Sequence, residues 1–240
     1  MSLFHTLARL YTPEDLSSQT NIPLSSQQAH YLCHVLRLKS GDPVRLFNGR
    51  DGEFLAKLKL TTKKSPHLDV ENRLHPQSPE KGPALVFAPI KNDRMGWMME
   101  KATELGVQEL FPVITERTTT RNFNRKRLEA RIIEAAEQCE RLTIPTLHDS
   151  LPLHDFLATW SKDIPILWAV ERTKAPTFVE ELKRQPTAMT FLVGPEGGFS
   201  NSEKEILKET SFMNPVTLGA KILRTETAAL SGLTLLQMAE

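Results

Sequence analysis

The sequence predicts an α/β protein with a mostly parallel sheet flanked by helices, preceded by a small amino-terminal β-barrel. From residue 84 onward, short apolar runs alternate with stretches of helical periodicity, as is typical of parallel sheets. Between residues 42 and 74, apolar and polar residues alternate as in half-buried strands. Between these parts, residues 75–83 hold three prolines and a glycine, which exclude regular structure. We therefore predict one domain over 1–74, a linker over 75–83 and a second domain over 84–240.

The amino-terminal part is expected to contain one helix over residues 27–38 and three strands. Phe54, Ala56, Leu58 and Leu60 fall on one face of the middle strand. The dipeptides Asn48-Gly49 and Asp51-Gly52 are strong turn formers between two of the strands. The strands are predicted over residues 42–48, 53–61 and 67–74.

The carboxy-terminal part is expected to alternate five strands with five helices. Ligands of such sheets bind beyond the carboxyl ends of the strands, so the loops that follow the strands are the first place to look for a site. The strands are predicted over residues 84–90, 107–114, 164–170, 189–193 and 215–218, and the helices over 95–105, 125–139, 178–184, 202–209 and 226–238.

Composition excludes several classes of protein. The only cysteines, Cys33 and Cys139, are far apart, which argues against a disulfide framework or a cysteine-based zinc site. His30 and His34 lie near Cys33 but lack a fourth ligand in sequence, so no metal is expected. No signal peptide and no apolar run of about 18 residues is present, so we expect a soluble cytoplasmic protein without a membrane span. The net charge of +1 does not indicate nucleic-acid binding. The basic residues between Glu116 and Arg131 could neutralise phosphates, but for a charge run alone a solvated helix face is the favoured interpretation.

A glycine-rich segment, Gly194-Pro195-Glu196-Gly197-Gly198, directly follows a predicted buried strand. Glycines at that place let the backbone approach a ligand closely, although a plain tight turn explains them equally well. Neither G-x-x-x-x-G-K-[ST] nor G-x-G-x-x-G is present, which excludes the ordinary nucleotide cradles. Ser200 and Glu203 match a capping box, so a helix is expected immediately afterwards.

A second segment, Leu218–Ala228, joins the last predicted strand to the last predicted helix. Thr225 is expected to cap that helix, and Glu226 falls in its first turn, where the helix dipole favours a carboxylate. Those structural roles are a complete explanation for both residues. Arg224 is different, because a guanidinium group in a compact loop needs an anionic partner.

Taken together, these two segments resemble the signature of the RsmE family, which methylates small-subunit ribosomal RNA. The resemblance covers nearly the whole chain, with Lys221 standing where an arginine is common in the family. Further matching stretches are Lys91–Arg94, Lys101–Val107, Arg131–Arg141, Arg9–Tyr11, His34–Arg37 and Gly41–Asp42.

The resemblance implies a PUA-like amino-terminal barrel that binds RNA and a carboxy-terminal SPOUT domain threaded into a deep trefoil knot, an exception to the rule against knots. It implies a homodimer that binds S-adenosyl-L-methionine in the knot loops. It also implies that the product is N3-methyluridine in the decoding region of 16S rRNA, at uridine 1498. Naked rRNA and the assembled small subunit both stay open as the substrate.

We expect the cofactor to contact mainly backbone of the two loops, with apolar walls from Leu218 and Leu223, which serve equally well as core residues. Arg224 is the candidate for stabilising the uracil anion, and Glu226 and Glu196 are candidate bases, although an ordinary carboxylate is a weak base. The expected cofactor-binding residues are Val193, Gly194, Glu196, Gly197, Gly198, Leu218, Gly219, Leu223 and Thr227.

Contacts to RNA phosphates are expected from basic residues of both parts, each of which has a surface salt bridge as its ordinary alternative. Two other functions stay open: a non-catalytic RNA-binding or ribosome-assembly factor, which would not bind the cofactor, and a small-molecule α/β enzyme, which the missing phosphate motifs disfavour. The candidate RNA-binding residues are Arg9, Arg37, Lys91, Arg94, Arg117, Arg121 and Arg141.

Overall fold

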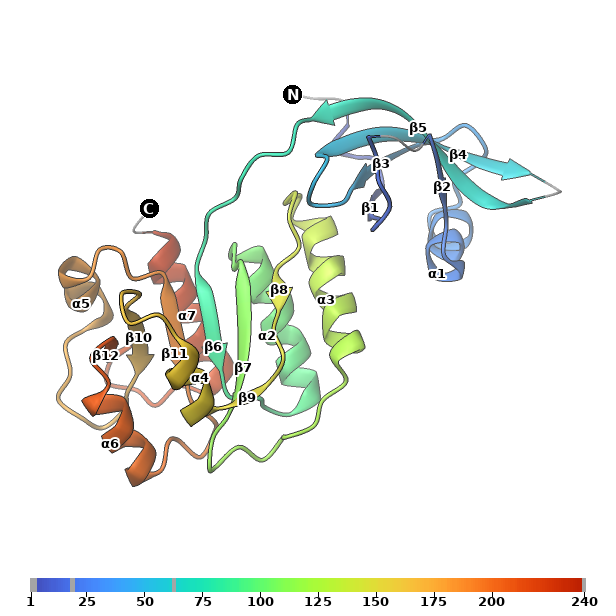
Figure 1. Cartoon of the computed structure of the whole chain (residues 1–240). Coiled ribbons are helices and arrows are strands. Elements are labelled where there is room, and N and C mark those ends of the chain that lie inside the picture. The colour runs from blue at the N-terminus through green and yellow to red at the C-terminus, as the bar shows by residue number, and fades with distance from the viewer. Residues whose placement is uncertain (1–3, 18–19, 62–63, 239–240) are drawn as a thin grey trace. The chain divides into compact units, whose positions relative to one another are not determined.

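The computed structural model describes residues 4–17, 20–61 and 64–238, which form two compact units (Figure 1). One unit comprises the chain up to Glu80 together with Ala136–Ile144, and the other comprises Lys81–Ala135 and Pro145–Glu240. The linker over residues 75–83 stays a prediction. No sequence pattern predicted that residues 136–144 join the first unit, because side-chain contacts with residues far away in sequence attach them there.

The first unit is built on a five-stranded sheet with the order β1-β3-β4-β5-β2, in which β1 and β2 lie at the two ends. The predicted strand over 53–61 is β4, with Phe54, Ala56 and Leu58 buried, but Leu60 is exposed, contrary to the expectation for that face. The strands β1 and β2 were not predicted, because three residues are too few to show an alternation. The bounds are β1 Arg9–Tyr11, β2 Asn21–Pro23, β3 Pro43–Phe47, β4 Glu53–Thr61 and β5 Lys64–His75.

The single helix predicted over 27–38 is shorter and irregular. It consists of α1, Ser26–His30, which continues into a π-helical turn, η1, at Tyr31–Val35. Ser25 and Gln28 form a capping box at its start. Arg37 has a φ of 58°, a left-handed conformation that does not continue a helix, so the chain turns away there.

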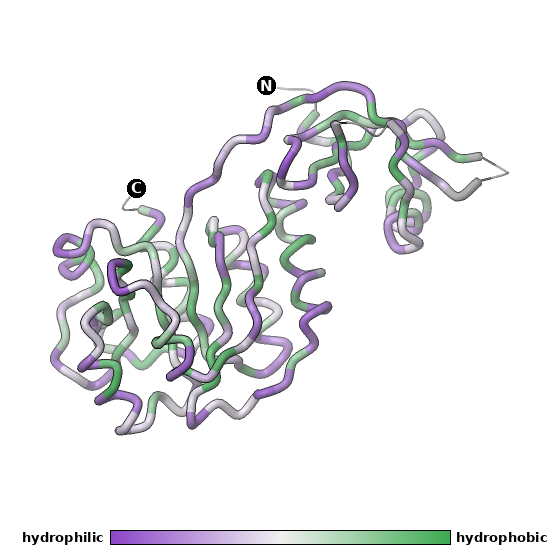
Figure 2. The backbone as a smooth tube through the Cα atoms, in the orientation of Figure 1, coloured by the Kyte–Doolittle hydropathy of each residue, from purple (hydrophilic) through white to green (hydrophobic). Residues whose placement is uncertain are grey.

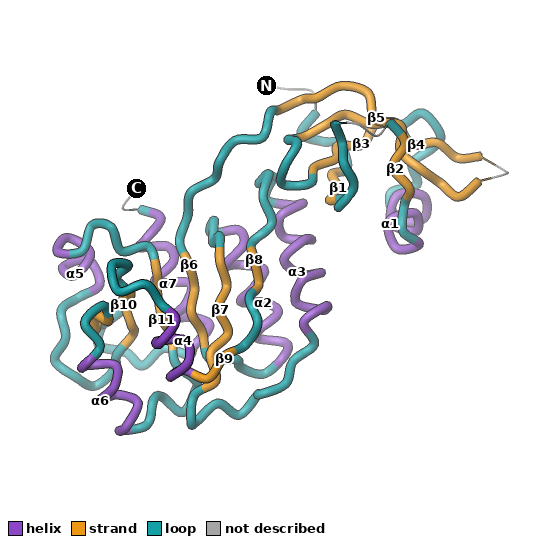
Figure 3. The backbone as a smooth tube through the Cα atoms, viewed as in Figure 1, coloured by secondary structure: helices purple, strands orange, loops and turns teal. Residues whose placement is uncertain are grey.

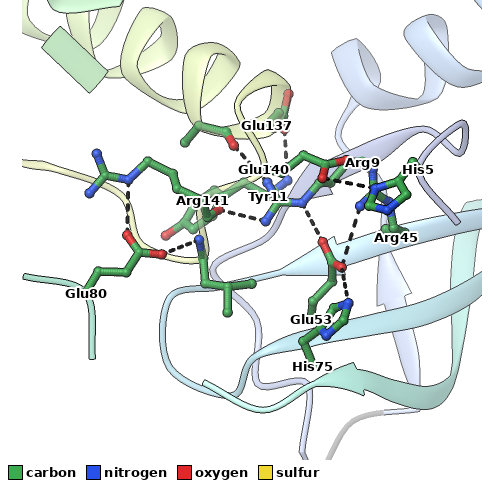
Figure 4. A network of polar contacts seen from close by, with 12 residues as sticks. His5, Arg9, Tyr11, Arg45, Glu53, His75, Glu80, Glu137, Glu140 and Arg141 are labelled. Atoms are coloured by element: carbon green, nitrogen blue, oxygen red, sulfur yellow. Dashed lines mark hydrogen bonds and ion pairs between the residues drawn. The ribbon is translucent and has the colours of Figure 1, made fainter. Parts of the chain in front are cut away.

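A buried polar network fastens residues 136–144 within the first unit (Figure 4). The Arg9 guanidinium binds the Glu53 carboxylate at 2.5 Å and donates to the carbonyl oxygens of Ala136 and Arg141 at 2.8 and 2.7 Å. Burial lowers the pKa of Arg9, and its hydrogen bond to Glu53 opposes that shift. Removing either partner of such a pair would leave the other charge buried without a counter-charge, which is strongly destabilising. The network therefore fixes the position of this segment within the first unit.

The second unit is built on a parallel sheet with the order β12-β10-β11-β6-β7-β8, to which β9 is added alongside β7. Every residue of β6 and β11 is buried, and Figure 2 shows the centre of this sheet mainly in green and white. Such continuous burial is typical of parallel strands covered on both faces. The bounds are β6 Ala84–Phe87, β7 Glu109–Ile114, β8 Thr146–Leu147, β9 Leu151–Pro152, β10 Ile166–Ala169, β11 Thr190–Val193 and β12 Met213–Val216.

Six helices of the described chain flank this sheet. In Figure 1, α2 and α7 lie behind the sheet and α4 lies in front of it. Gly232 allows α7 to approach β11, since a Cβ at that position would lie 2.2 Å from the Phe191 ring. The bounds are α2 Asn92–Glu104, α3 Arg125–Gln138, α4 Leu153–Thr159, α5 Phe178–Arg184, α6 Asn201–Glu209 and α7 Thr225–Gln237.

Several elements of the second unit differ from the predicted ones, and the short strands β8 and β9 were not predicted. The last strand lies at Met213–Val216 rather than 215–218, so Thr217 and Leu218 belong to the loop that follows it. Helix α4 was not predicted, since its seven residues follow Pro152 without a side-chain cap and give only two buried positions, Leu153 and Phe156. The loops that follow β10, β11 and β12 are drawn in teal in Figure 3, and they build the site described below.

Candidate functional site

Three loops that follow neighbouring parallel strands line an open cavity of about 990 Å³ in the second unit. They follow β10, β11 and β12, as expected for a ligand site at the carboxyl ends of parallel strands. Residues 193–199 contain the glycine-rich segment, and residues 217–225 contain the second segment singled out in the sequence. The third loop, residues 169–174, was not predicted as part of the site.

The glycine-rich loop turns sharply and then enters α6. A Cβ at Gly194 would lie 2.7 Å from the Phe199 ring, so that ring leaves no room for a larger residue. Gly198 has a φ of 66° and donates its N–H to the Pro195 carbonyl oxygen at 2.8 Å. The predicted capping box is present at Ser200.

The Glu203 carboxylate of that capping box has a second role. Its Oε2 accepts from the Ser200 N–H, and its Oε1 accepts from the Glu116 N–H, both at 2.8 Å. Arg117, the next residue, donates from Nη1 to the Gly197 carbonyl oxygen at 3.0 Å. The loop that follows β7 therefore contacts both the glycine-rich loop and the start of α6, and the Arg117 guanidinium makes the contact with the glycine-rich loop.

The second segment differs from the prediction at Thr225. Arg224 is the N-cap of α7 and makes no side-chain cap, so Thr225 is not the cap but the first helical residue. Its hydroxyl donates instead to the Gly194 carbonyl oxygen at 3.0 Å. Because this bond crosses from the start of α7 to the end of β11, it joins the two segments that the sequence singled out.

Arg224 is exposed at the boundary of two cavities. It lines the cavity of about 990 Å³ and a neighbouring one of about 680 Å³. Its expected anionic partner is absent, since no ion pair of Arg224 occurs among residues 4–17, 20–61 and 64–238. A guanidinium without a partner at a cavity wall is available to a ligand that brings its own negative charge.

Arg94 is engaged by two carboxylates of the site. Its Nη1 lies 2.7 Å from Glu196 Oε1, and its Nε lies 3.8 Å from Glu226 Oε1. Glu226 is nine-tenths buried, and its Oε2 has no hydrogen-bond partner. Arg94 thus connects the glycine-rich loop to the first turn of α7, which differs from the phosphate contact expected for it.

The cavity gathers most of the residues expected to bind the cofactor. Gly197 and Thr227 do not line it, since Gly197 faces Arg117 and Thr227 lines the two neighbouring cavities. Arg172, Lys174 and Lys221 line the cavity and are exposed, and sequence patterns had not singled them out as site residues. The position of β10 beside β11 could have indicated residues 169–174. The predicted residues that line the cavity are Val193, Gly194, Glu196, Gly198, Leu218, Gly219 and Leu223.

The arginines expected to bind RNA fall into different environments. Arg9 and Arg141 are buried in the first unit, where Arg9 binds Glu53 and Arg141 lies 3.4 Å from Glu80. Burial lowers the pKa of Arg141, and the neighbouring Glu80 opposes that shift. Both guanidinium groups are therefore held inside the fold, which argues against their contact with phosphates.

Four of the expected RNA-binding residues are exposed, among them Arg117, which contacts the glycine-rich loop. Arg37, Lys91 and Arg121 are exposed and have no ion-pair partner in the described part of the chain. By contrast, the three arginines of α3 pair with acidic neighbours, as the plain helix-face interpretation predicts: Arg125 with Glu129 and Asp149, Arg127 with Asp93, and Arg131 with Glu134.

The described residues contain no group of three or more His, Cys, Asp or Glu side chains that could hold a metal ion. None of their helices has the length and apolar character needed to cross a membrane.

Comparisons with known proteins place the chain in a family. Residues 78–237 match the model of an RNA methyltransferase domain, and residues 24–71 match that of an RNA methyltransferase PUA domain. The chain is 35% identical to the ribosomal RNA small subunit methyltransferase E of Rickettsia conorii, over 94% of this chain and 93% of that protein.

Two solved structures share the fold along nearly the whole chain. One, from Legionella pneumophila in complex with the cofactor SAM, is 31% identical, with a TM-score of 0.84 and coverage of 97% of this chain and 98% of that one. The other, a ribosomal RNA small subunit methyltransferase E from Neisseria gonorrhoeae bound to S-adenosyl methionine, is 28% identical, with a TM-score of 0.81 and coverage of 97% of each chain. The chain therefore belongs to the RNA methyltransferase family, and within it to the ribosomal RNA small subunit methyltransferase E (RsmE) family.

Proposed function

We propose that this protein transfers a methyl group from S-adenosylmethionine to N3 of a uridine in 16S ribosomal RNA. The observation that carries the proposal is the Thr225–Gly194 hydrogen bond, which brings the two RsmE-like segments together on one cavity. The cavity volume of about 990 Å³ lies within the range of about 300–1,000 Å³ typical of small-molecule sites.

The lining of the cavity fits the chemistry of this cofactor. Backbone of Gly194 and Gly219 is open to a ligand, and Leu218 and Leu223 offer apolar surface for an adenosine moiety. Glu171 and Glu196 offer carboxylates for an amino group, and Arg172, Lys174 and Lys221 offer cations for a carboxylate. The absence of a phosphate-binding sequence motif agrees with a nucleoside that has no phosphate.

The residues of the chain then have to prepare the acceptor nitrogen. S-adenosylmethionine supplies a sulfonium methyl group, whose bond to sulfur breaks as the N–CH₃ bond forms, with the bonding electron pair left on sulfur. N3 of uracil becomes nucleophilic only when its proton leaves, and Glu226, at the start of α7, is the proposed acceptor of that proton. The Arg224 guanidinium stabilises the negative charge that then spreads over the uracil oxygens.

The proposed RNA contacts are restricted by the burial of two candidates. We retain Arg37, Lys91, Arg117 and Arg121 as phosphate contacts, because their side chains are exposed. Arg172, Lys174 and Lys221, which line the cofactor cavity and are exposed, are further proposed phosphate contacts near the site of methyl transfer. If phosphates are bound in this way, RNA affinity falls steeply as salt is raised, and a flat salt dependence would contradict it.

We also propose that the protein is a homodimer. A cavity of about 670 Å³ lies between α5 and α7 and is lined by apolar residues that include Phe178, Leu230 and Leu235, with Val179 half exposed beside them. An apolar surface of this kind is typical of a subunit interface. A V179D variant should then shift the sedimentation coefficient to that of a monomer, and an unchanged coefficient in V179D, or a monomeric wild type, would reject the proposal.

The deep trefoil knot is part of the same proposal. Its support is the meeting of the loops that follow β11 and β12, which the Thr225 hydroxyl holds together. A threaded chain should refold much more slowly after complete unfolding than an unthreaded α/β domain of this size, and fast single-step refolding would argue against threading.

One experiment tests the activity directly. 16S rRNA from cells with and without this protein is digested and mapped by mass spectrometry for N3-methyluridine, expected at uridine 1498. Calorimetry of the purified protein with S-adenosylmethionine separates the enzyme from a non-catalytic RNA-binding factor. An unchanged methylation map would reject the substrate, and absence of cofactor binding would reject the enzyme.

A further inference from the structure

A second cavity adjoins the proposed cofactor cavity and has no assigned ligand. Its volume is about 680 Å³, and it lies between the start of α2 and residues 222–227. It shares Arg94, Ile222, Leu223 and Arg224 with the first cavity. Groups bound in the two cavities would therefore meet across this common wall.

One wall of the second cavity is an exposed aromatic ring. Trp97 lies on α2 between the buried residues Met95 and Met98, yet it is 46% exposed. It also lines the cavity near α5 and α7 at which the homodimer contact is proposed. Its indole contacts no other aromatic ring in the part of the chain that the structure describes. An open indole face at a cavity is a stacking surface for a planar base.

The polar groups of this cavity form a distinct pattern. The Glu226 carboxylate is nine-tenths buried and has one oxygen without a hydrogen-bond partner, and the guanidinium groups of Arg94 and Arg224 line the same cavity. Rotation about the last side-chain bond of Glu226 exchanges its two oxygens, so either can face the cavity. The cavity thus offers one buried acceptor and two sets of donors, and the Asp93 carboxylate and Thr227 hydroxyl that also line it are exposed to solvent.

This pattern matches the Watson–Crick edge of uracil. That edge presents the N3–H donor between two carbonyl acceptors, O2 and O4. Cytosine presents an acceptor at N3 and a donor at its amino group, so it would place a lone pair against the Glu226 carboxylate. A buried acceptor that finds no donor costs free energy, and hydrogen-bonding sites reject such mismatched ligands strongly.

We propose that the second cavity binds the target uracil of a flipped-out nucleotide, with Trp97 stacked on its face and Glu226 accepting from its N3–H. In this arrangement Glu226 sets the preference for uracil over cytosine, and Trp97 contributes affinity without distinguishing the two bases. The inference rests on the proposed function and deepens it by assigning the substrate base to a cavity of its own.

The test uses the full-length protein with S-adenosylhomocysteine and two short single-stranded RNA oligonucleotides that differ only in one U or C. The wild-type protein should bind the U oligonucleotide about tenfold or more tightly than the C oligonucleotide. E226Q should bring the two affinities close together, because an amide can donate to N3 of cytosine. W97A should weaken binding of both oligonucleotides by a similar factor of about ten, and W97F should retain most of the affinity.

Three measurements keep the outcomes separate. Cofactor calorimetry reports on the proposed function, and its failure in the wild-type protein would reject that function independently of the second cavity. With the cofactor bound, equal affinities of the wild type for the two oligonucleotides, or no binding of either, would overturn the assignment of the cavity. A change of oligomeric state in W97A that accounts for its weaker binding would also overturn it, because Trp97 would then be an interface residue.

Discussion

The Thr225 hydroxyl donates a hydrogen bond to the Gly194 carbonyl oxygen at 3.0 Å, across 31 residues of sequence. Thr225 is buried at the first position of α7, and Gly194 directly follows β11. This bond fixes the distance between the glycine-rich loop and the segment that presents Arg224. Both segments line the proposed cofactor cavity, so the bond should matter for stability and for ligand binding.

T225V tests this bond with a side chain of nearly the same shape. The Gly194 carbonyl oxygen loses its donor, which should lower the free energy of unfolding by about 0.5–1.5 kcal/mol. Affinity for S-adenosylmethionine should also fall, because the two loops are no longer held together. Chemical denaturation and calorimetry measure the two effects, and T225S, which retains the hydroxyl, should lie near the wild type in both. Full cofactor affinity in a destabilised T225V would show that the bond serves the fold alone.

R224A tests the role of the guanidinium that has no ion-pair partner in the described chain. If Arg224 stabilises charge that develops on uracil, single-turnover methylation should slow by about 10²–10³-fold. The affinity for S-adenosylmethionine should change much less. R224K is the matched control, since it retains the charge but loses the planar donor arrangement, and should fall between the two. Equal losses of turnover and cofactor affinity would contradict the assigned role.

G194A tests the close approach of the glycine-rich loop to Phe199. The added Cβ would lie 2.7 Å from the buried ring, so the ring or the loop has to move. Overpacking of this kind should cost about 1–3 kcal/mol of stability. In the double mutant G194A/F199L the smaller side chain should relieve part of the cost, which a double-mutant cycle would record as a favourable coupling. Strictly additive effects would show that the two positions do not press on each other.

Acid stability tests the contact between Arg45 and Glu140 in the first unit. A hydrogen bond from Arg45, at 2.7 Å, lowers the pKa of the Glu140 carboxyl below its ordinary value of 4.5. A depressed folded-state pKa stabilises the fold above the ordinary value, and that contribution disappears as the pH falls through the folded-state pKa. E140Q should therefore be less stable than the wild type at pH 7, with a difference that shrinks below about pH 4.5. Denaturation between neutral and acidic pH measures this, and a difference that stays constant or grows in acid would reject the linkage.

Local sequence patterns predicted the bounds of those elements whose formation depends mainly on their own residues. The alternation in β4 predicted its bounds, and the capping box of Ser200 and Glu203 predicted the start of α6. The glycines after β11 and the RsmE-like segments indicated the two loops that line the cavity. Elements of two or three residues, such as β1, contain too little periodicity to be recognised without their partners.

The sequence by itself determined the α/β class, most of the regular elements and the family, because periodicity, caps and motifs are properties of neighbouring residues. Only the tertiary structure decided what each polar side chain contacts. It placed Arg9 and Arg141 in the interior, turned Thr225 from an expected cap into a link to Gly194, and bound Arg94 to Glu196 and Glu226. The physical reason is that burial and charge pairing depend on residues brought together from distant parts of the chain. The local sequence around a charged residue does not show whether its side chain binds a carboxylate inside the fold or a phosphate outside it.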